Sequence, residues 1–301
     1  MLFSSILALT DFSAAGDKAL ERAAQIALAH RATLRLMLLP ADHETACLDP
    51  DTRLRQTAQA LAMRLGTPVT AAGSVDGSPD ALAAYARAGD LLVLPQRSRR
   101  SMTHWLAGPD AIRILRACPC PVLVARGAVR RRLRQVVVGV EFTPAAQQRA
   151  MLACLLAPGA DVELFHAVDT HGESQLRQAE VDDAVLRNYR DNCMEHAQMR
   201  LRWMTQSLAA LGHEVVTAAL RGEPARQLVL RQQWIGADLL VVGKQRRHAL
   251  FDAVLRSTAH QVLAQARCDV LLVPHDYVVS ATAARPRPAV AQDPDLAAVA
   301  V

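Results

Sequence analysis

The sequence predicts an α/β protein of two tandem modules, each a five-stranded parallel sheet with helices on both faces. The first observation is a repeat: residues 90–125 align without a gap on residues 238–273, so that Asp90 pairs with Asp238 and Cys120 with Cys268. The second is the alternation of short apolar runs with segments of helical periodicity, which is typical of parallel strands joined by helical crossovers. The third is that apolar runs such as LLVLP and LLVVG are nearly continuous, as strands buried on both faces require.

The first module is expected to occupy residues 1–126 and to alternate five strands with four helices. Its apolar runs predict strands, and its amphipathic segments predict helices. The expected strands are SILAL at 5–9, ATLRLMLL at 32–39, VTAAGSV at 69–75, DLLVLP at 90–95 and PVLVA at 121–125, and the expected helices cover 14–30, 51–65, 80–88 and 109–117.

The second module, residues 135–276, repeats this order. Thr143 followed by Pro144 predicts a helix start, because threonine is a good N-cap and proline suits the first helical position; Ser78 and Pro79 repeat this arrangement in the first module. The expected strands are VVVGV at 136–140, VELFHAV at 162–168, EVVTAAL at 214–220, DLLVVG at 238–243 and VLLVP at 270–274, and the helices begin at Pro144, about 174, Pro224 and about 257. The second of these helical stretches continues to 211 and has no counterpart of that length in the first module.

Two further segments flank the second module. Residues 127–134 form a basic linker, in which Arg130, Arg131, Arg132 and Arg134 follow Arg126. A nucleic-acid or acidic-partner patch is one interpretation, but no aromatic residues interleave with these arginines, which favours a solvated linker. Residues 277–301 are rich in alanine and proline and show no periodicity, so we expect a disordered tail.

Composition narrows the class of protein. The formal net charge is +5 and about half of the residues are apolar, without an apolar run long enough to cross a bilayer. The amino-terminal stretch lacks a basic region and a cleavage pattern and is expected to be a first strand, not a signal peptide. The six cysteines have no paired CxxC spacing, so we expect them to be reduced and the protein to be cytoplasmic. Cys118 and Cys120 are the closest pair; a redox or metal site is one interpretation, and small buried residues at a strand entrance are the favoured one.

Metal and hydrophobic-ligand sites are weaker hypotheses. His166, His171, His196 and His213 do not show the i, i+4 spacing with a carboxylate that is typical of a ligand set, so core or surface histidine is favoured. The apolar residues of the segment 169–211 predict a cover for the core, and a hydrophobic ligand or partner surface is the alternative.

Ligands of doubly wound sheets bind at the carboxyl ends of the strands, where the strand order reverses. Asp11 and Glu141 follow the first strand of each module, and Gly77 and Gly222 follow the third. A carboxylate near a helix start and a glycine in a turn also have purely structural roles, and both interpretations stay open.

These motifs together resemble the universal stress protein (UspA) family. The resemblance rests on TDFS at 10–13 and VEFTP at 140–144, on VDGSPDAL and LRGEPARQL, and on ACPCPVLVA and ARCDVLLVP. It covers nearly the whole chain as two copies and is most similar to the tandem E-type proteins. The resemblance implies a nucleotide-binding, Rossmann-like sheet in each module and pairing of the modules through their last strands. It also implies that Asp11 stands where the family contacts adenosine, while Glu141 is one methylene longer.

Family members that bind ATP carry a loop of the form GxxG, nine residues, then glycine and serine or threonine. Bare backbone N–H groups of such a loop close on phosphates. The corresponding second-module positions are Gly243, Arg246, Arg256 and Ser257, followed by Thr258, so one glycine and the hydroxyl remain. Arg256 either blocks the pocket or grips an anion together with Arg246, since a guanidinium matches phosphate as a bidentate fork.

The first module keeps less of this loop. The corresponding positions are Pro95, Ser98, Gly108 and Pro109, and the two prolines remove backbone donors. Classical ATP binding is therefore expected to be lost in this module, with Gly108 as its only matching glycine. ATP or another nucleotide in the second module is the only cofactor that the resemblance raises.

Three functional classes follow. The favoured one is a non-catalytic tandem stress protein that acts through ligand sensing or contact with an unidentified protein partner, with homodimerisation left open. An ATP-binding or weakly ATP-hydrolysing stress protein that uses the second module is the first alternative. A nucleic-acid or acidic-partner binder that uses the arginine-rich linker is the second. The SGGxDS and HxGH motifs of related nucleotide enzymes do not occur in the sequence.

Overall fold

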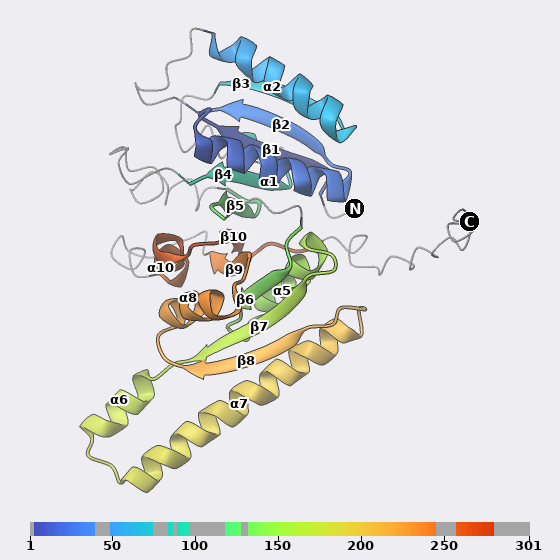
Figure 1. Ribbon diagram of the computed structural model, residues 1–301. Coiled ribbons are helices and arrows are strands. Elements are labelled where there is room, and N and C mark those ends of the chain that lie inside the picture. The colour runs from blue at the N-terminus through green and yellow to red at the C-terminus, as the bar shows by residue number, and fades with distance from the viewer. Residues whose placement is uncertain are drawn as a thin grey trace, which may run out of the picture.

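All ten strands form one sheet in a computed structural model that describes residues 3–39, 49–74, 84–86, 89–96, 118–127, 132–244 and 257–279. Its strand order is β3-β2-β1-β4-β5-β10-β9-β6-β7-β8, and every neighbouring pair is parallel except β5 and β10. Each half therefore has the same doubly wound order, and the two halves meet at their last strands (Figure 1). The strands are β1 Ser5–Thr10, β2 Thr33–Leu38, β3 Val69–Ser74, β4 Leu91–Pro95, β5 Val122–Ala125, β6 Gln135–Gly139, β7 Asp161–Val168, β8 Val216–Arg221, β9 Leu239–Lys244 and β10 Asp269–Pro274.

Helices cover both faces of the sheet, as predicted. One face packs against α1 (Ala14–His30), α2 (Pro50–Leu65), α5 (Pro144–Leu156) and α7 (Asp183–Ala209), and the other against α8 (Pro224–Ile235) and α10 (Thr258–Gln265). The central strands are the most deeply buried: all residues of β4, β5 and β10 are buried. This explains why their sequences are continuous apolar runs instead of alternating patterns.

The paired aspartates of the repeat have the same structural role in each half. Asp90 Oδ2 accepts hydrogen bonds from the backbone N of Ser4 (2.6 Å) and Ser5 (3.1 Å), at the start of β1. Asp238 Oδ2 accepts from the backbone N of Arg134 (2.8 Å) and Gln135 (3.2 Å), at the start of β6. Each aspartate thus holds the start of the first strand of its module beside the fourth strand, and this contact is the same in both copies of the repeat.

Side-chain caps fix the helix starts, at Thr143 as predicted and at Ser13 in addition. Ser13 caps α1 by accepting from Gly16 N, and Thr143 caps α5, whose first residue is Pro144, by accepting from Ala146 N. The helical stretch expected from about 174 to 211 consists of two helices, α6 (His171–Gln178) and α7. Between them Glu180 adopts a left-handed φ of 52°, which an α-helix does not contain, and Asp182 then caps α7.

Several predicted segments fall wholly or partly outside the described residues. These are the helices at 80–88 and 109–117, apart from a helical piece at 84–86, the linker residues 128–131, and the end of the chain from 280. Residues 277–279 differ from the expected tail: Val279 is buried, and its backbone N donates to Gln148 Oε1 on α5 (3.0 Å). Burial raises the pKa of the neighbouring Tyr277 to about 12.

Candidate ligand crevices and the module junction

The turn after the first strand of each module has a strained backbone. Phe12 and Phe142 have φ values of 57° and 53°, a region that bulky residues rarely adopt. Each ring is covered by an arginine from a later helix of its module: Arg53 of α2 lies 4.3 Å from the Phe12 ring centroid, and Arg200 of α7 lies 5.5 Å from that of Phe142. These cation–π contacts help to hold a turn that brings the helix start directly behind the strand.

Asp11 is engaged in this turn in the first module. Its Oδ1 accepts from Ser13 N (3.1 Å) and Ser13 Oγ (2.5 Å), and its residue is 8% exposed. A side chain at Gly16 would place a Cβ 2.7 Å from the same oxygen, so the helix backbone closes over the carboxylate. The structural role that the sequence left open for Asp11 is therefore present in the structure. Pro95 ends β4 beside β1, at the switch point, and supplies no backbone N–H there.

In the second module, the crevice between the ends of β6 and β9 is occupied by an ion pair. Glu141 follows β6, and its two carboxylate oxygens accept from both terminal nitrogens of Arg149 on α5 (Nη2 to Oε2 2.6 Å, Nη1 to Oε1 3.3 Å). The Arg149 side chain is 1% exposed and that of Glu141 is 49% exposed. The guanidinium is thus deep in the crevice, and the carboxylate closes it toward solvent.

Gly243 shows how tightly Arg149 fills this space. A Cβ on Gly243 would lie 2.0 Å from Arg149 Nη1 and 3.0 Å from His275 Nε2, so a side chain at this position would have to displace the guanidinium. In the family motif the glycine leaves its backbone bare for phosphate, whereas here an internal guanidinium lies against it. Arg149 Nε is buried and has no hydrogen-bond partner.

Sequence reasoning predicted Glu141 and Gly243 but missed Arg149. A signal was available: when Phe12 is placed under Phe142, Arg149 aligns with Ala19, a fully buried residue of α1. Arg149 also lies among the buried alanines of α5, on the helix face that contacts the sheet. A long base on an apolar face predicts a buried partner.

The other predicted positions have local structural roles or are not described. Gly222 has a φ of 136°, and its turn leads to Glu223, which caps α8 by accepting from Ala225 N and Arg226 N. Ser257 Oγ accepts from His260 N (3.3 Å) and caps α10, whose first residue is Thr258. Arg246, Arg256, Gly77 and Gly108 lie outside the described residues, so the blocking or gripping role of the two arginines stays a prediction.

His166 lies next to the second crevice. Its Nδ1 lies 2.8 Å from Val140 O, and its ring packs 4.1 Å from that of Phe142. Burial lowers the pKa of His166, while Glu141 opposes this shift and His196 adds to it. Within the described part of the chain, no group of three or more histidine, cysteine or acidic side chains could hold a metal ion.

A shallow hollow lies beside the Phe142 turn. It is lined by Phe142, Pro144, Arg200, Trp203 and Met204, among others, and has a volume of about 160 Å³. Pockets for drug-sized ligands usually have about 300–1,000 Å³. Trp203 is 56% exposed, so the hollow is an open apolar surface on α7 and does not enclose a ligand.

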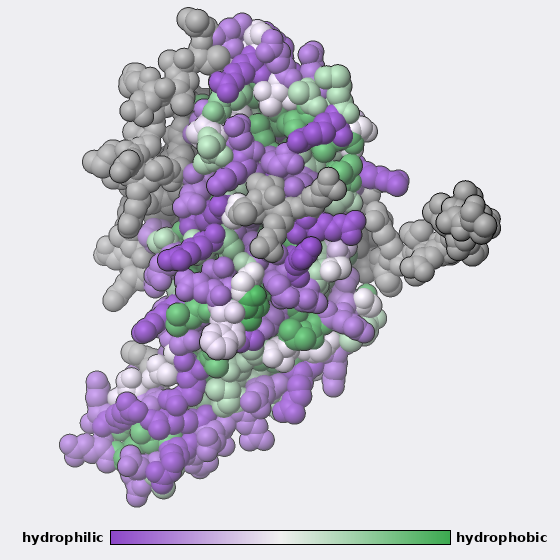
Figure 2. All heavy atoms as spheres, in the orientation of Figure 1, coloured by the Kyte–Doolittle hydropathy of each residue, from purple (hydrophilic) through white to green (hydrophobic). Residues whose placement is uncertain are grey.

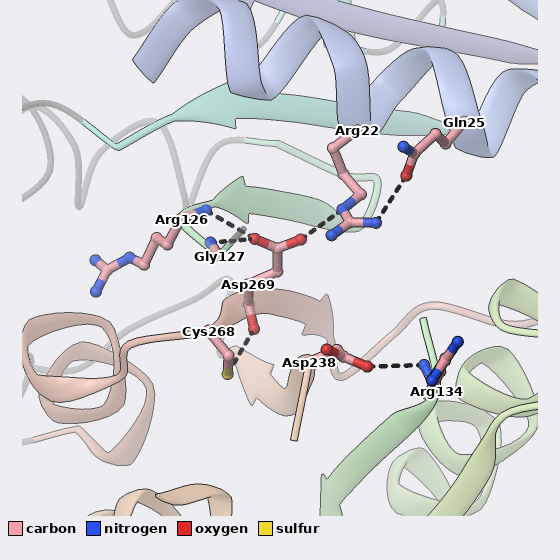
Figure 3. Close-up of polar contacts among 8 residues, drawn as sticks. All are labelled: Arg22, Gln25, Arg126, Gly127, Arg134, Asp238, Cys268 and Asp269. Carbon is pink, nitrogen blue, oxygen red and sulfur yellow. Dashed lines mark hydrogen bonds and ion pairs between the residues drawn. The ribbon is translucent and has the colours of Figure 1, made fainter. Parts of the chain in front are cut away.

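The junction of the modules is centred on a buried carboxylate (Figure 3). Asp269, at the start of β10, accepts on Oδ2 from Arg22 Nε of α1 (2.6 Å) and on Oδ1 from the backbone N of Arg126 (2.7 Å) and Gly127 (2.8 Å). The side chains of Arg22 and Asp269 are 4% and 1% exposed. Three segments, two from the first module and one from the second, therefore converge on one charged group.

Comparisons with known proteins agree with the duplicated architecture. The model of the universal stress protein family matches residues 3–126 and again 132–274. Universal stress protein A homolog 2 of Coxiella burnetii is 33% identical over 120 residues, which cover 38% of this chain and 74% of the relative.

Solved structures show the same fold. A universal stress protein from Archaeoglobus fulgidus aligns with 90% of this chain and 96% of its own, at 17% identity and a TM-score of 0.62. A protein of unknown function from Pseudomonas aeruginosa PAO1 aligns with 90% of this chain and 92% of its own, at 20% identity and a TM-score of 0.60. No helix among the described residues is long and apolar enough to span a membrane. Two matches to one family model, which together cover most of the chain, show that it belongs to the universal stress protein family.

Proposed function

We propose that this chain is a non-catalytic tandem stress protein of the cytoplasm, which senses a ligand or contacts a protein partner and does not bind ATP in the manner of its family. The observation that carries the proposal is the Arg149 guanidinium, which is buried against Gly243 and paired with Glu141. ATP would have to displace this group and then place its phosphates beside a carboxylate.

Charge and space both support this view of the second module. Removing a buried guanidinium from its carboxylate typically costs about 3–5 kcal/mol when both groups are buried. Half of Glu141 is exposed to water, so the cost here is expected to be smaller. The Arg149 guanidinium also occupies the space beside Gly243 that a phosphate would need. This steric conflict does not depend on solvent and adds to the electrostatic cost of breaking the ion pair.

The first module supports the proposal through different residues. Asp11 already uses one oxygen to hold Ser13, and Pro95 removes a backbone donor from the position where the phosphate loop would begin. The crevices of the two modules are therefore altered by different residues.

The test is nucleotide binding by the whole chain and its Arg149→Ala variant. Native mass spectrometry of freshly purified protein should show no bound nucleotide, and ATP, ADP, AMP and cAMP at about 1 mM should raise the melting temperature no more than inorganic phosphate at the same concentration, because affinities of the crevice for nucleotide are expected to be weaker than about −4 kcal/mol. Arg149→Ala should open the crevice and allow nucleotide to raise the melting temperature. Arg149→Met, which retains most of the volume but not the charge, should not.

Opposite outcomes identify the alternatives. If the unmodified chain binds ATP and Arg149→Ala weakens binding, the guanidinium is a phosphate ligand and the proposal is wrong. If Arg256→Gly raises ATP affinity while the Arg149 variants have no effect, the block lies at Arg256 instead. ATP turnover that disappears in Ser257→Ala would favour a weak hydrolase, and nucleic-acid affinity that falls steeply with salt would favour the linker hypothesis.

A further inference from the structure

The short helix α6 is attached to the molecule in an unusual way. Together with the first part of α7 it extends beyond the edge strand β8, away from the rest of the protein (Figure 1). The surface of this projecting part is mostly hydrophilic (Figure 2). Among the described side chains of α6, only Glu173 is buried, with 6% of the residue exposed. The helix therefore has a buried carboxylate where an amphipathic helix would have an apolar stripe.

Three arginines from three elements surround this carboxylate. Arg177 Nη2 of α6 lies 2.8 Å from Glu173 Oε1, Arg190 of α7 contacts the same oxygen, and Arg221 at the end of β8 contacts Oε2. One carboxylate neutralises only one of the three positive charges in this ion-pair cluster. In addition, Arg190 Nε is buried without a hydrogen-bond partner, so a donor of the cluster is unused.

The arginines differ in what they would do if α6 moved. Arg177 is four residues from Glu173 on the same helix, so this pair would leave together and remain satisfied. Arg190 and Arg221 belong to α7 and β8 and would stay behind as two guanidinium groups that face one position. Two fixed guanidinium groups match a doubly charged tetrahedral oxyanion in both charge and hydrogen-bond geometry.

We propose that Arg190 and Arg221 form an oxyanion site that Glu173 occupies as an internal ligand, and that phosphate, free or as a monoester, competes with Glu173 and releases α6. The exchange is non-covalent and reversible. Phosphate replaces the carboxylate on the two arginines, while Glu173 and Arg177 become solvated together. Leu176 is the one large apolar side chain of α6 and is only partly buried, so release of the helix loses little hydrophobic contact.

The first measurement is hydrogen exchange of the whole chain with and without inorganic phosphate, with chloride at equal ionic strength as the reference. Phosphate should increase the exchange of amides in residues 172–178 and leave those of β6 and β9 unchanged. AMP compared with adenosine distinguishes the two sources of the ligand: a response to AMP and phosphate alike indicates a site for the phosphate group alone, and a stronger response to AMP indicates a monoester. If the amides of residues 172–178 exchange at the same rate in phosphate as in chloride, the proposal is overturned.

The second measurement uses Glu173→Gln, which removes the internal anion and keeps the size of the side chain. Phosphate should bind this variant about tenfold more tightly than the unmodified chain, as expected when one competing charged contact is removed, and should raise its melting temperature. Arg221→Gln in the same background should abolish the gain. Glu21→Gln is the matched control, because it breaks the exposed Arg64–Glu21 pair on α1 and α2 and should create no phosphate response. Equal phosphate stabilisation of Glu173→Gln and Glu21→Gln would contradict the proposed site.

Discussion

Arg22→Met tests whether the buried ion pair at the junction holds the two modules together. Arg22 Nε lies 2.6 Å from Asp269 Oδ2, and both side chains are almost completely buried. The substitution keeps the volume and the unbranched stem of the side chain but removes the charge. Asp269 is then left as a buried carboxylate with two backbone donors, Arg126 N and Gly127 N.

The expected loss follows from this geometry. Breaking a buried ion pair by removing one partner typically costs about 3–5 kcal/mol, because the other charge stays desolvated. The two backbone hydrogen bonds to Asp269 still stabilise its charge, so we expect the lower end, about 3 kcal/mol. At about 2–4 °C per kcal/mol for domains of this size, the melting temperature should fall by roughly 6–12 °C.

The assay is urea unfolding followed by circular dichroism, combined with a double-mutant cycle. Asp269→Asn alone should also destabilise the protein, because it leaves Arg22 buried without its counter-ion. The double variant should be more stable than the sum of the single losses predicts, with a coupling of about 2 kcal/mol or more. Arg64→Met is the control, since the Arg64 and Glu21 side chains are 52% and 37% exposed and such pairs contribute about 1 kcal/mol or less. Additive losses, or an Arg22→Met effect no larger than that of the control, would refute the reasoning.

Three further predictions concern single groups. Burial raises the pKa of Cys120 and Cys268 to about 12 and of Cys154 to about 11, and Cys118 is also buried. In a Cys47→Ser background at about pH 8, a thiol reagent should therefore modify only Cys193 in the folded chain. Fast labelling of a second thiol would contradict this. Burial lowers the pKa of His166, so the unfolded chain takes up the proton first and stability should fall as the pH drops below about 6.5, the ordinary value. The fall measured by urea unfolding should be smaller in His166→Asn, and an unchanged pH dependence would exclude His166 as a cause. Ser257→Ala should cost about 1 kcal/mol through loss of the α10 cap, and Ser257→Asp should restore it if the role of the hydroxyl is capping.

Local chemistry explains why most element boundaries could be predicted. The strand-to-helix turns at Ser13 and Thr143 carry their own capping side chains, and Pro144 and Pro224 occupy the first helical position that suits them. The break between α6 and α7 could not be found in this way. Its left-handed residue is Glu180, where no glycine or asparagine signals such a conformation.

Long-range pairs explain why the sites were predicted only in part. Asp11 and Glu141 follow strands and Gly243 lies near the end of β9, so topology alone placed them at the carboxyl edge of the sheet. Arg22 has its partner 247 residues away, and no local pattern indicates which acid a buried arginine will meet. The cluster around Glu173 was missed for the same reason, because its arginines come from α6, α7 and β8.

The comparison of the two crevices shows why the second is closed in a stable way. At aligned positions the first module has Asp11 and Ala19, whereas the second has Glu141 and Arg149. An arginine buried at this depth without an acid would be strongly destabilising, and the Glu141 carboxylate after β6 reaches it. Arg149 and Glu141 therefore each lower the energetic cost of having the other in the crevice. Removal of Arg149 reopens the crevice for a nucleotide, and the Glu141 carboxylate that remains there limits the affinity that Arg149→Ala gains.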